Sequence, residues 1–181
     1  MNKSKKNVIF ILIGLVALIV CGSIFYNAQK KPQDSSHNGN TITAIDFAVK
    51  NKNGTNTYLS DFKDGKIIVI NFWSSQCGPC VEEMPDFQKL YDEYKDRVHF
   101  VMIDSIGAIG ETKEMGENFI KTNGYTFPVY YDVNQNAQQE YGIRSFPTTY
   151  LINENFEITK GGPGMINYEI LSNAIEEELN N

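Results

Sequence analysis

The chain alternates between short apolar runs and longer stretches in which apolar residues recur every three or four positions. Residues 67–73, Ile-Ile-Val-Ile-Asn-Phe-Trp, are mostly β-branched or aromatic and predict a central strand buried on both faces. Residues 78–95 place Met84 and Phe87 at helical spacing among charged residues, which predicts an amphipathic helix. A second buried strand is expected at residues 98–104.

The other segments of the folded part carry shorter patterns of the same two kinds. Alternating apolar residues before Asn53-Gly54 predict a hairpin over residues 45–58. The later elements expected are a segment of helical character between 107 and 124, an extended piece at 127–131, a short helix at 135–141, strands at 145–152 and 156–160, a sheet end at 161–164 and a helix at 168–179. This order predicts an α/β fold with a mixed central β-sheet flanked by helices.

The N-terminal part has a different pattern. Residues 8–25 are eighteen residues without a charge, and as a helix they would span about 27 Å, close to the thickness of a bilayer core. We therefore expect a cytoplasmic start at residues 1–7, a transmembrane signal anchor at 8–25, a flexible linker at 26–41 and a folded domain at 42–181. The expected location is a bacterial cell membrane, crossed once, with the folded domain outside the cytoplasm.

Two other interpretations of the apolar segment remain open. A cleaved signal peptide has a shorter apolar core and a small-x-small cleavage site, and neither is present here. Lipidation of Cys21 would need a small residue just before it, where Val20 stands. An uncleaved anchor is therefore favoured, with Cys21 as one more apolar residue of the span.

The net charge of the chain becomes more negative when the N-terminal segment is left out. The whole chain has a formal net charge of −6, but residues 1–31 hold five lysines and no acid. The remaining residues contain eleven basic and twenty-two acidic side chains, a net charge of −11. An acidic surface of this kind argues against nucleic acid or anionic lipid as a partner of the folded part, and it favours solubility.

The candidate chemistry lies between the predicted central strand and the predicted helix. Cys77 and Cys80 are two of the three cysteines of the chain, in the sequence Cys77-Gly78-Pro79-Cys80. Free amide donors and the dipole at a helix N-terminus favour a thiolate on the first cysteine. Cys77 is therefore the candidate nucleophile and Cys80 its resolving partner.

A cysteine pair also has other uses. The pair could form half of a zinc site, a structural disulfide or two core cysteines. A zinc site needs two further ligands, and only Cys21, His37 and His99 remain. Redox chemistry without a metal is therefore favoured.

Six motifs in order resemble the thioredoxin superfamily over about residues 42–179. The motifs are Asn71-Phe72-Trp73, Cys77-Gly78-Pro79-Cys80, Glu83-Met84-Pro85, Tyr125-Thr126-Phe127-Pro128-Val129, Tyr141-Gly142-Ile143 and Phe146-Pro147-Thr148-Thr149-Tyr150-Leu151-Ile152. An insert between the second strand and the Pro-Thr-Thr segment narrows the resemblance to the membrane-anchored TlpA/ResA-like thiol-disulfide oxidoreductases.

The resemblance implies a thioredoxin-like fold and a set of site residues. Cys77 would attack a client disulfide, Cys80 would resolve the mixed disulfide, and Pro147 would be a cis-proline that offers backbone to an extended substrate segment. The supporting residues would be Trp73, Gly78, Pro79, Phe146 and Thr148. No cofactor is implied beyond the redox-active Cys77–Cys80 disulfide.

The sequence departs from the family pattern at three positions. Asn71 stands where cytoplasmic thioredoxins have a buried carboxylate, so a buried acid is not assumed as proton acceptor. Gln76 replaces a tryptophan that many members have beside the nucleophile. Gly78 stands where ResA-like cytochrome-maturation proteins often have glutamate, which weakens assignment to that pathway. Glu111 receives no role, because its segment aligns poorly.

The acidic residues after the dithiol bear on the direction of electron flow. Glu82 and Glu83 follow Cys80 closely, and nearby negative charge raises a thiol pKa. We therefore expect a protein disulfide reductase that acts on exported protein thiols, with apocytochrome c as one candidate client and a membrane electron donor. The alternatives are a disulfide oxidase or isomerase for secreted proteins, or a non-catalytic dithiol module that handles a metal or haem. Peroxide reduction would need a different local motif.

Overall fold

Eight strands form one sheet in the order β1-β8-β7-β4-β5-β6-β2-β3. The computed structural model describes residues 42–181. The strands are β1 (Ile42–Thr43), β2 (Ala48–Lys50), β3 (Asn56–Tyr58), β4 (Ile67–Trp73), β5 (Val98–Asp104), β6 (Val129–Tyr131), β7 (Thr148–Ile152) and β8 (Glu157–Pro163). The helices are η1 (Leu59–Phe62), α2 (Gly78–Tyr94), η2 (Ala108–Gly110), α3 (Lys113–Asn123), α4 (Asn136–Glu140) and α5 (Tyr168–Leu179).

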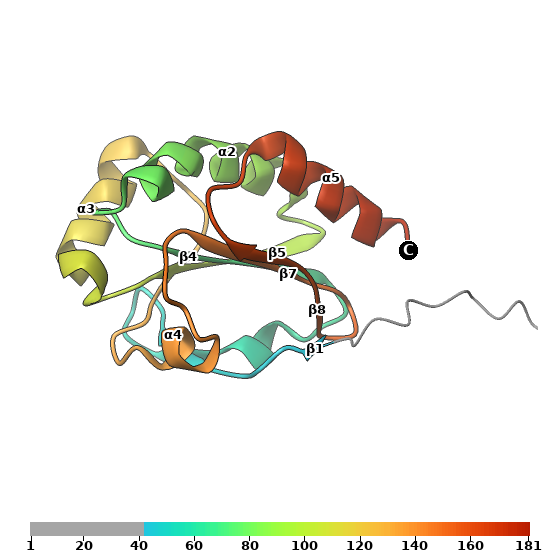
Figure 1. Cartoon of the computed structure of the whole chain (residues 1–181), viewed down its shortest axis with the longest axis horizontal. Helices are drawn as coiled ribbons and strands as arrows, with labels where there is room; N and C mark the ends of the chain where they lie inside the picture. The colour runs from blue at the N-terminus through green and yellow to red at the C-terminus, as the bar shows by residue number, and fades with distance from the viewer. Residues whose placement is uncertain (1–41) are drawn as a thin grey trace, which may run out of the picture. The chain divides into compact units, whose positions relative to one another are not determined.

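Strand β4 lies at the centre of the sheet and is buried along its whole length. It runs parallel to β5 and antiparallel to β7, and β5 runs parallel to β6. Helices α2, α3 and α5 cover one face of the sheet, and α4 lies on the other (Figure 1). The predicted α/β architecture with a mixed sheet and flanking helices is confirmed.

The alternation of side chains along β4 divides the core into two clusters. Ile67, Val69 and Trp73 belong to the cluster that also contains the cysteine pair and the apolar side chains of α2. Ile68 and Ile70 belong to the cluster on the opposite face. Successive strand residues point to opposite faces, so an uninterrupted apolar run is what a strand covered on both sides requires.

The expected elements outside the described residues are the cytoplasmic start, the signal anchor and the linker, at residues 1–7, 8–25 and 26–41. They therefore stay predictions. Within residues 42–181, no helix combines the length and the apolar character that crossing a membrane requires.

The structure differs from the sequence expectation at the glycine-rich segment. Residues 161–164 were expected to end the sheet, but β8 continues to Pro163 and pairs Gly161 with Tyr150. A Cβ on Gly161 would lie 2.2 Å from the backbone oxygen of Thr149, and its φ is +132°. Glycine here permits close strand pairing instead of ending the strand.

Two segments around the active site show where helices begin and end. Helix α2 continues through Pro85 as one element; the sequence also predicts a kink at this proline, and that stays a prediction. Helix α3 begins only at Lys113. Residues 105–112 therefore form a loop with a single turn, η2, directly after the end of β5.

Candidate active site

The cysteine pair lies where β4 ends and α2 begins, as the sequence predicted. Cys77 is the N-cap of α2, and its sulfur accepts the backbone N–H of Cys80 at 3.3 Å. A disulfide joins the two residues, whose Cα atoms lie 5.2 Å apart. Cys77 is 6% exposed and Cys80 is fully buried. Cys77 is therefore the sulfur that an incoming reactant meets first.

The segment around Pro147 reaches the same edge of the sheet from the far end of the chain. Thr148 pairs with Phe72 in the antiparallel ladder between β7 and β4, so Pro147 lies next to the end of β4, where the cysteine loop starts. The Phe146–Pro147 peptide bond is cis. The Thr148 hydroxyl donates to the backbone oxygen of Ser145 at 2.8 Å and closes the turn before it.

A buried carboxylate, Glu83, lies three residues after Cys80 on the same face of α2. Glu83 is only 2% exposed. Its carboxylate accepts the Asn71 side-chain amide at 2.8 Å and the backbone N–H of Ile166 at 3.0 Å. Burial raises the pKa of Glu83 to about 7, against the opposing effect of these two hydrogen bonds. The group therefore titrates near neutral pH, as a general acid or base must.

The sequence places Glu83 in the Glu83-Met84-Pro85 motif and among the acidic residues that follow Cys80, but neither feature predicts that Glu83 is buried. The helical periodicity could have indicated this burial, because Glu83 lies on the same face of α2 as Cys80, Met84 and Phe87, which are all buried. Asn71 stands where a buried acid is found in cytoplasmic thioredoxins, and its amide also donates to the Thr149 hydroxyl at 3.0 Å. The acid of this site thus comes from the helix and is held by the strand residue.

Replacing Glu83 with glutamine is expected to remove a pH-dependent step near pH 7 from the rate of thiol-disulfide exchange. Below that pH the carboxyl already holds a proton and cannot accept one from Cys80, so the wild-type rate should rise with pH through 7. We expect Glu83→Gln to lower the rate at pH 8 by about tenfold to a hundredfold. Stopped-flow tryptophan fluorescence measures the rate, and Glu82→Gln, an exposed neighbour on the same helix, should leave the profile unchanged.

A second buried carboxylate, Glu111, fixes the loop that carries the cysteines. Glu111 is 2% exposed. Its oxygens accept the hydroxyls of Ser74 at 2.6 Å and Ser75 at 2.9 Å, and the backbone N–H of Gln76 at 3.2 Å. Three donors on one carboxylate hold the residues just before Cys77 in a single conformation. The contact joins residues about 35 positions apart, and local sequence patterns carry no sign of it.

The remaining predicted site residues surround this centre in different ways. Trp73 is fully buried, with its ring 5.8 Å from that of Phe119 on α3. Gly78 and Pro79 form the first turn of α2. Phe146 is half-buried and packs against both core clusters.

Asp104, at the end of β5, pairs with Trp73 in the parallel ladder and is fully buried. Within residues 42–181 neither of its carboxylate oxygens has a hydrogen-bond partner. Burial, with the negative charges of Glu111 and Glu117, raises the pKa of Asp104 to about 8. The carboxyl is therefore mostly protonated at neutral pH beneath α3.

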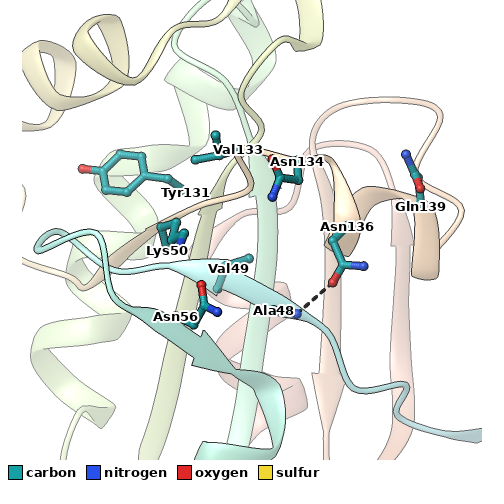
Figure 2. Close-up of a pocket in the computed structure, with 9 residues that line it drawn as sticks. All are labelled: Ala48, Val49, Lys50, Asn56, Tyr131, Val133, Asn134, Asn136 and Gln139. Carbon is teal, nitrogen blue, oxygen red and sulfur yellow. Dashed lines mark hydrogen bonds between the residues drawn. The ribbon is translucent and has the colours of Figure 1, made fainter.

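Two surface cavities lie apart from the cysteine pair. The cavity in Figure 2, of about 430 Å³, lies between β2, the end of β6 and α4, and its wall includes Lys50, Tyr131 and Asn134. Asn136 closes one side by accepting the backbone N–H of Ala48 at 2.9 Å. Neither this cavity nor a second one of about 420 Å³ includes a residue of the cysteine loop or of the Pro147 turn.

Residues 42–181 contain no cluster of three or more His, Cys, Asp or Glu side chains that could hold a metal ion. The redox group of the site is the cysteine pair itself.

Comparison with known proteins decides the family. The model of the AhpC/TSA family matches residues 42–160. The chain belongs to this family. The thiol-disulfide oxidoreductase ResA of Bacillus subtilis is 33% identical to this chain over 159 residues, which cover 86% of this chain and 85% of ResA. ResA of Halalkalibacterium halodurans is 32% identical over 97% of both chains.

A solved structure gives the same assignment. The crystal structure of StoA from Bacillus subtilis is similar with a TM-score of 0.62 and 32% identity, over 71% of this chain and 95% of StoA. The resemblance to TlpA/ResA-like proteins is confirmed, and this AhpC/TSA family member is a thiol-disulfide oxidoreductase with a thioredoxin-like fold.

Proposed function

We propose that the chain is an extracytoplasmic protein disulfide reductase that keeps exported protein thiols reduced. The observation that carries the proposal is the disulfide of Cys77 with Cys80 at the N-terminus of α2, in which Cys77 is the more accessible sulfur, on the edge of the sheet that the Pro147 turn also reaches. Protein clients and a membrane electron donor are its partners. Apocytochrome c is one candidate client, as the resemblance to ResA-like cytochrome-maturation proteins implies.

The proposed reaction moves two electrons in two exchange steps. In the reduced protein the Cys77 thiolate attacks one sulfur of a client disulfide and releases the first client thiolate. The Cys80 thiolate then attacks the Cys77 sulfur of the mixed disulfide and releases the second. The client gains two electrons and, with protons, two thiols, while Cys77–Cys80 becomes a disulfide. The membrane donor supplies the two electrons that reduce it again.

Each remaining site residue has a proposed part in these steps. Pro147 offers backbone to the client segment, while Phe146 and Thr148 hold its turn. Glu83 accepts the proton that Cys80 loses before it attacks. Trp73, Gly78 and Pro79 shape the strand end and the first helical turn that place the Cys77 sulfur.

The proposed location depends on the N-terminal sequence. Lysines at positions 3, 5 and 6 precede the uncharged segment 8–25, a pattern that keeps the start of a chain in the cytoplasm and exports the residues after the apolar segment. The similarity to ResA of Halalkalibacterium halodurans covers 97% of this chain. We therefore place residues 8–25 in the cell membrane as a single span and the thioredoxin-like domain outside.

A reducing potential is the expected result that separates this function from a disulfide oxidase. The side chains directly after Cys80, Val81-Glu82-Glu83, carry no positive charge, so little beyond the helix N-terminus stabilises the Cys77 thiolate. Its pKa should lie toward the upper part of the range of roughly 3.5 to 7.5 for activated cysteines. Titration against dithiothreitol should give a potential near that of thioredoxin, roughly −270 mV. A potential near roughly −120 mV, typical of a strong oxidase, would support the oxidase alternative.

A further inference from the structure

Ile109 has an unusual backbone conformation in the loop after β5. Its φ is +52° and its ψ is +27°, in the left-handed region. A β-branched residue is rarely found there, because its side chain crowds the backbone. Ile109 is also 60% exposed, so the strain is not offset by burial of its side chain in the core. Strain retained at an exposed position is a reason to look for function.

The loop that carries Ile109 is fastened to the cysteine loop. The backbone N–H of Gly107 donates to the oxygen of Glu111 at 2.9 Å and closes the turn around Ile109. The backbone N–H of Ser105 donates to the backbone oxygen of Trp73, the last residue of β4, at 2.9 Å. The Glu111 carboxylate accepts hydrogen bonds from the residues just before Cys77. Ile109 is therefore held at a fixed place relative to the dithiol.

The surroundings of Ile109 leave room for another side chain. Gly107 and Gly110 flank the turn. A Cβ added at Gly110 would meet no atom within 4 Å, whereas one at Gly107 would lie 2.9 Å from Nε2 of Gln135, so the open space lies on the Gly110 side of Ile109. The folded part is strongly acidic, yet Ile109 exposes an aliphatic side chain on the loop whose Glu111 carboxylate hydrogen-bonds the residues just before Cys77. An apolar side chain of a bound segment would remove water from this surface, whereas a charged side chain would gain nothing from it.

We propose that Ile109 is a specificity-determining residue for client proteins. It contacts an apolar side chain adjacent to the reactive cysteine of an extended client segment while Cys77 attacks that client's disulfide. The inference rests on the proposed function, since it concerns which protein disulfides the site accepts. Glu111 has a positioning role in it, because it sets the loop against the dithiol.

Two matched disulfide peptides test the proposal with the full-length chain. The peptides are identical except that leucine or serine stands beside the cysteine, and the rate constant for reduction of each is measured by loss of the protein dithiol. For the wild type we expect the leucine peptide to react about three to ten times faster. Ile109→Gly and Ile109→Asn should bring the ratio close to one, because both residues tolerate positive φ but lack the apolar side chain.

Three further measurements separate recognition from a structural role. The rate with hydroxyethyl disulfide and the dithiol potential should stay at the wild-type values in both variants. The melting temperature of Ile109→Gly should not fall, since glycine relieves the strained φ. Ile42→Asn is the matched control, because Ile42 is also 60% exposed and pairs with Ile158 at the opposite end of the sheet. It should keep the leucine preference.

Each negative result of the peptide experiment leads to a different conclusion. No leucine preference in the wild type, an unchanged preference in Ile109→Gly, or an equal loss in Ile42→Asn would each overturn the role of Ile109. A wild-type protein that exchanges with hydroxyethyl disulfide and reduces both peptides equally would leave the proposed reductase function intact while overturning this inference. A wild-type protein that exchanges with none of the three would overturn both.

Discussion

A Cys80→Ser variant is expected to accumulate mixed disulfides between Cys77 and its client proteins. Cys77 is the more accessible sulfur and caps the N-terminus of α2, where a thiolate is favoured. Without the Cys80 sulfur, residues 42–181 contain no second cysteine that could displace the client, so the covalent complex persists. Turnover of a protein disulfide should fall on the order of a hundredfold or more, because release then depends on an external thiol.

The mixed disulfides are detected by non-reducing electrophoresis of complexes from intact cells, and the trapped clients are identified by mass spectrometry. Cys77→Ser is the matched control, since it keeps the fully buried cysteine and loses the more accessible one, and it should trap no client. Trapping by Cys77→Ser instead would reverse the two roles. Trapped clients that are all cytoplasmic proteins would contradict the proposed location, while a Cys80→Ser protein that traps nothing would favour the non-catalytic binding module.

Replacing Gly116 with alanine is expected to destabilise the fold, although the same change stabilises most helices. Gly116 lies within α3 and is buried. A Cβ there would lie 2.0 Å from Oδ2 and 2.8 Å from Cγ of Asp104. Alanine has a helix propensity about 1 kcal/mol better than glycine, but overpacking of a core contact costs about 1–3 kcal/mol, and occasionally more. We expect steric repulsion to win, so the free energy of unfolding should fall by about 1–2 kcal/mol.

Urea unfolding at pH 6 measures the effect, with most of the Asp104 carboxyl still protonated. Gly78→Ala is the control, since a Cβ on Gly78 would meet nothing within 4 Å, and it should not lower stability. Adding Asp104→Ser to Gly116→Ala should recover most of the loss in a double-mutant cycle, because serine removes the atoms that clash. If Gly116→Ala were as stable as the wild type, α3 would not be held tightly against Asp104.

The contact between α3 and Asp104 also bears on the active site. Asp104 pairs with Trp73 at the end of β4, and Trp73 packs against Phe119 of α3. The segment between β5 and α3 contains Glu111, which holds the cysteine loop. A shift of α3 would therefore reach the residues before Cys77 through both the strand end and this loop.

Local patterns were sufficient for the elements that carry the cysteines. The boundaries of β4 and β5 agree with their apolar runs, and those of α2 and α5 agree with their helical spacing to within one residue. Each of these elements buries one or both of its faces, so the period of its apolar residues is visible in its own sequence. The strand β1 has only two residues, which is too short for any period to be visible.

The sequence predicted the position of the cysteines, but it did not predict that two of the acidic residues are buried. Glu83 and Glu111 lie in polar stretches of the sequence, yet both are almost fully buried. Their partners come from distant segments, Ile166 in one case and Ser74, Ser75 and Gln76 in the other. Whether a carboxylate is solvated or buried depends on what covers it, and no local pattern contains that information.

The amino-acid sequence by itself determined the dithiol, its place at a strand-to-helix junction, the α/β class and the family, because these properties depend on residue identity and on short-range periodicity. Only the tertiary structure decided which carboxylates surround the dithiol, that the acid near Cys80 is Glu83, and that Ile109 is held exposed and strained on the loop that Glu111 fastens to the cysteine loop. These properties depend on desolvation and on hydrogen bonds between segments far apart in the chain, which form only when the sheet brings those segments to one edge.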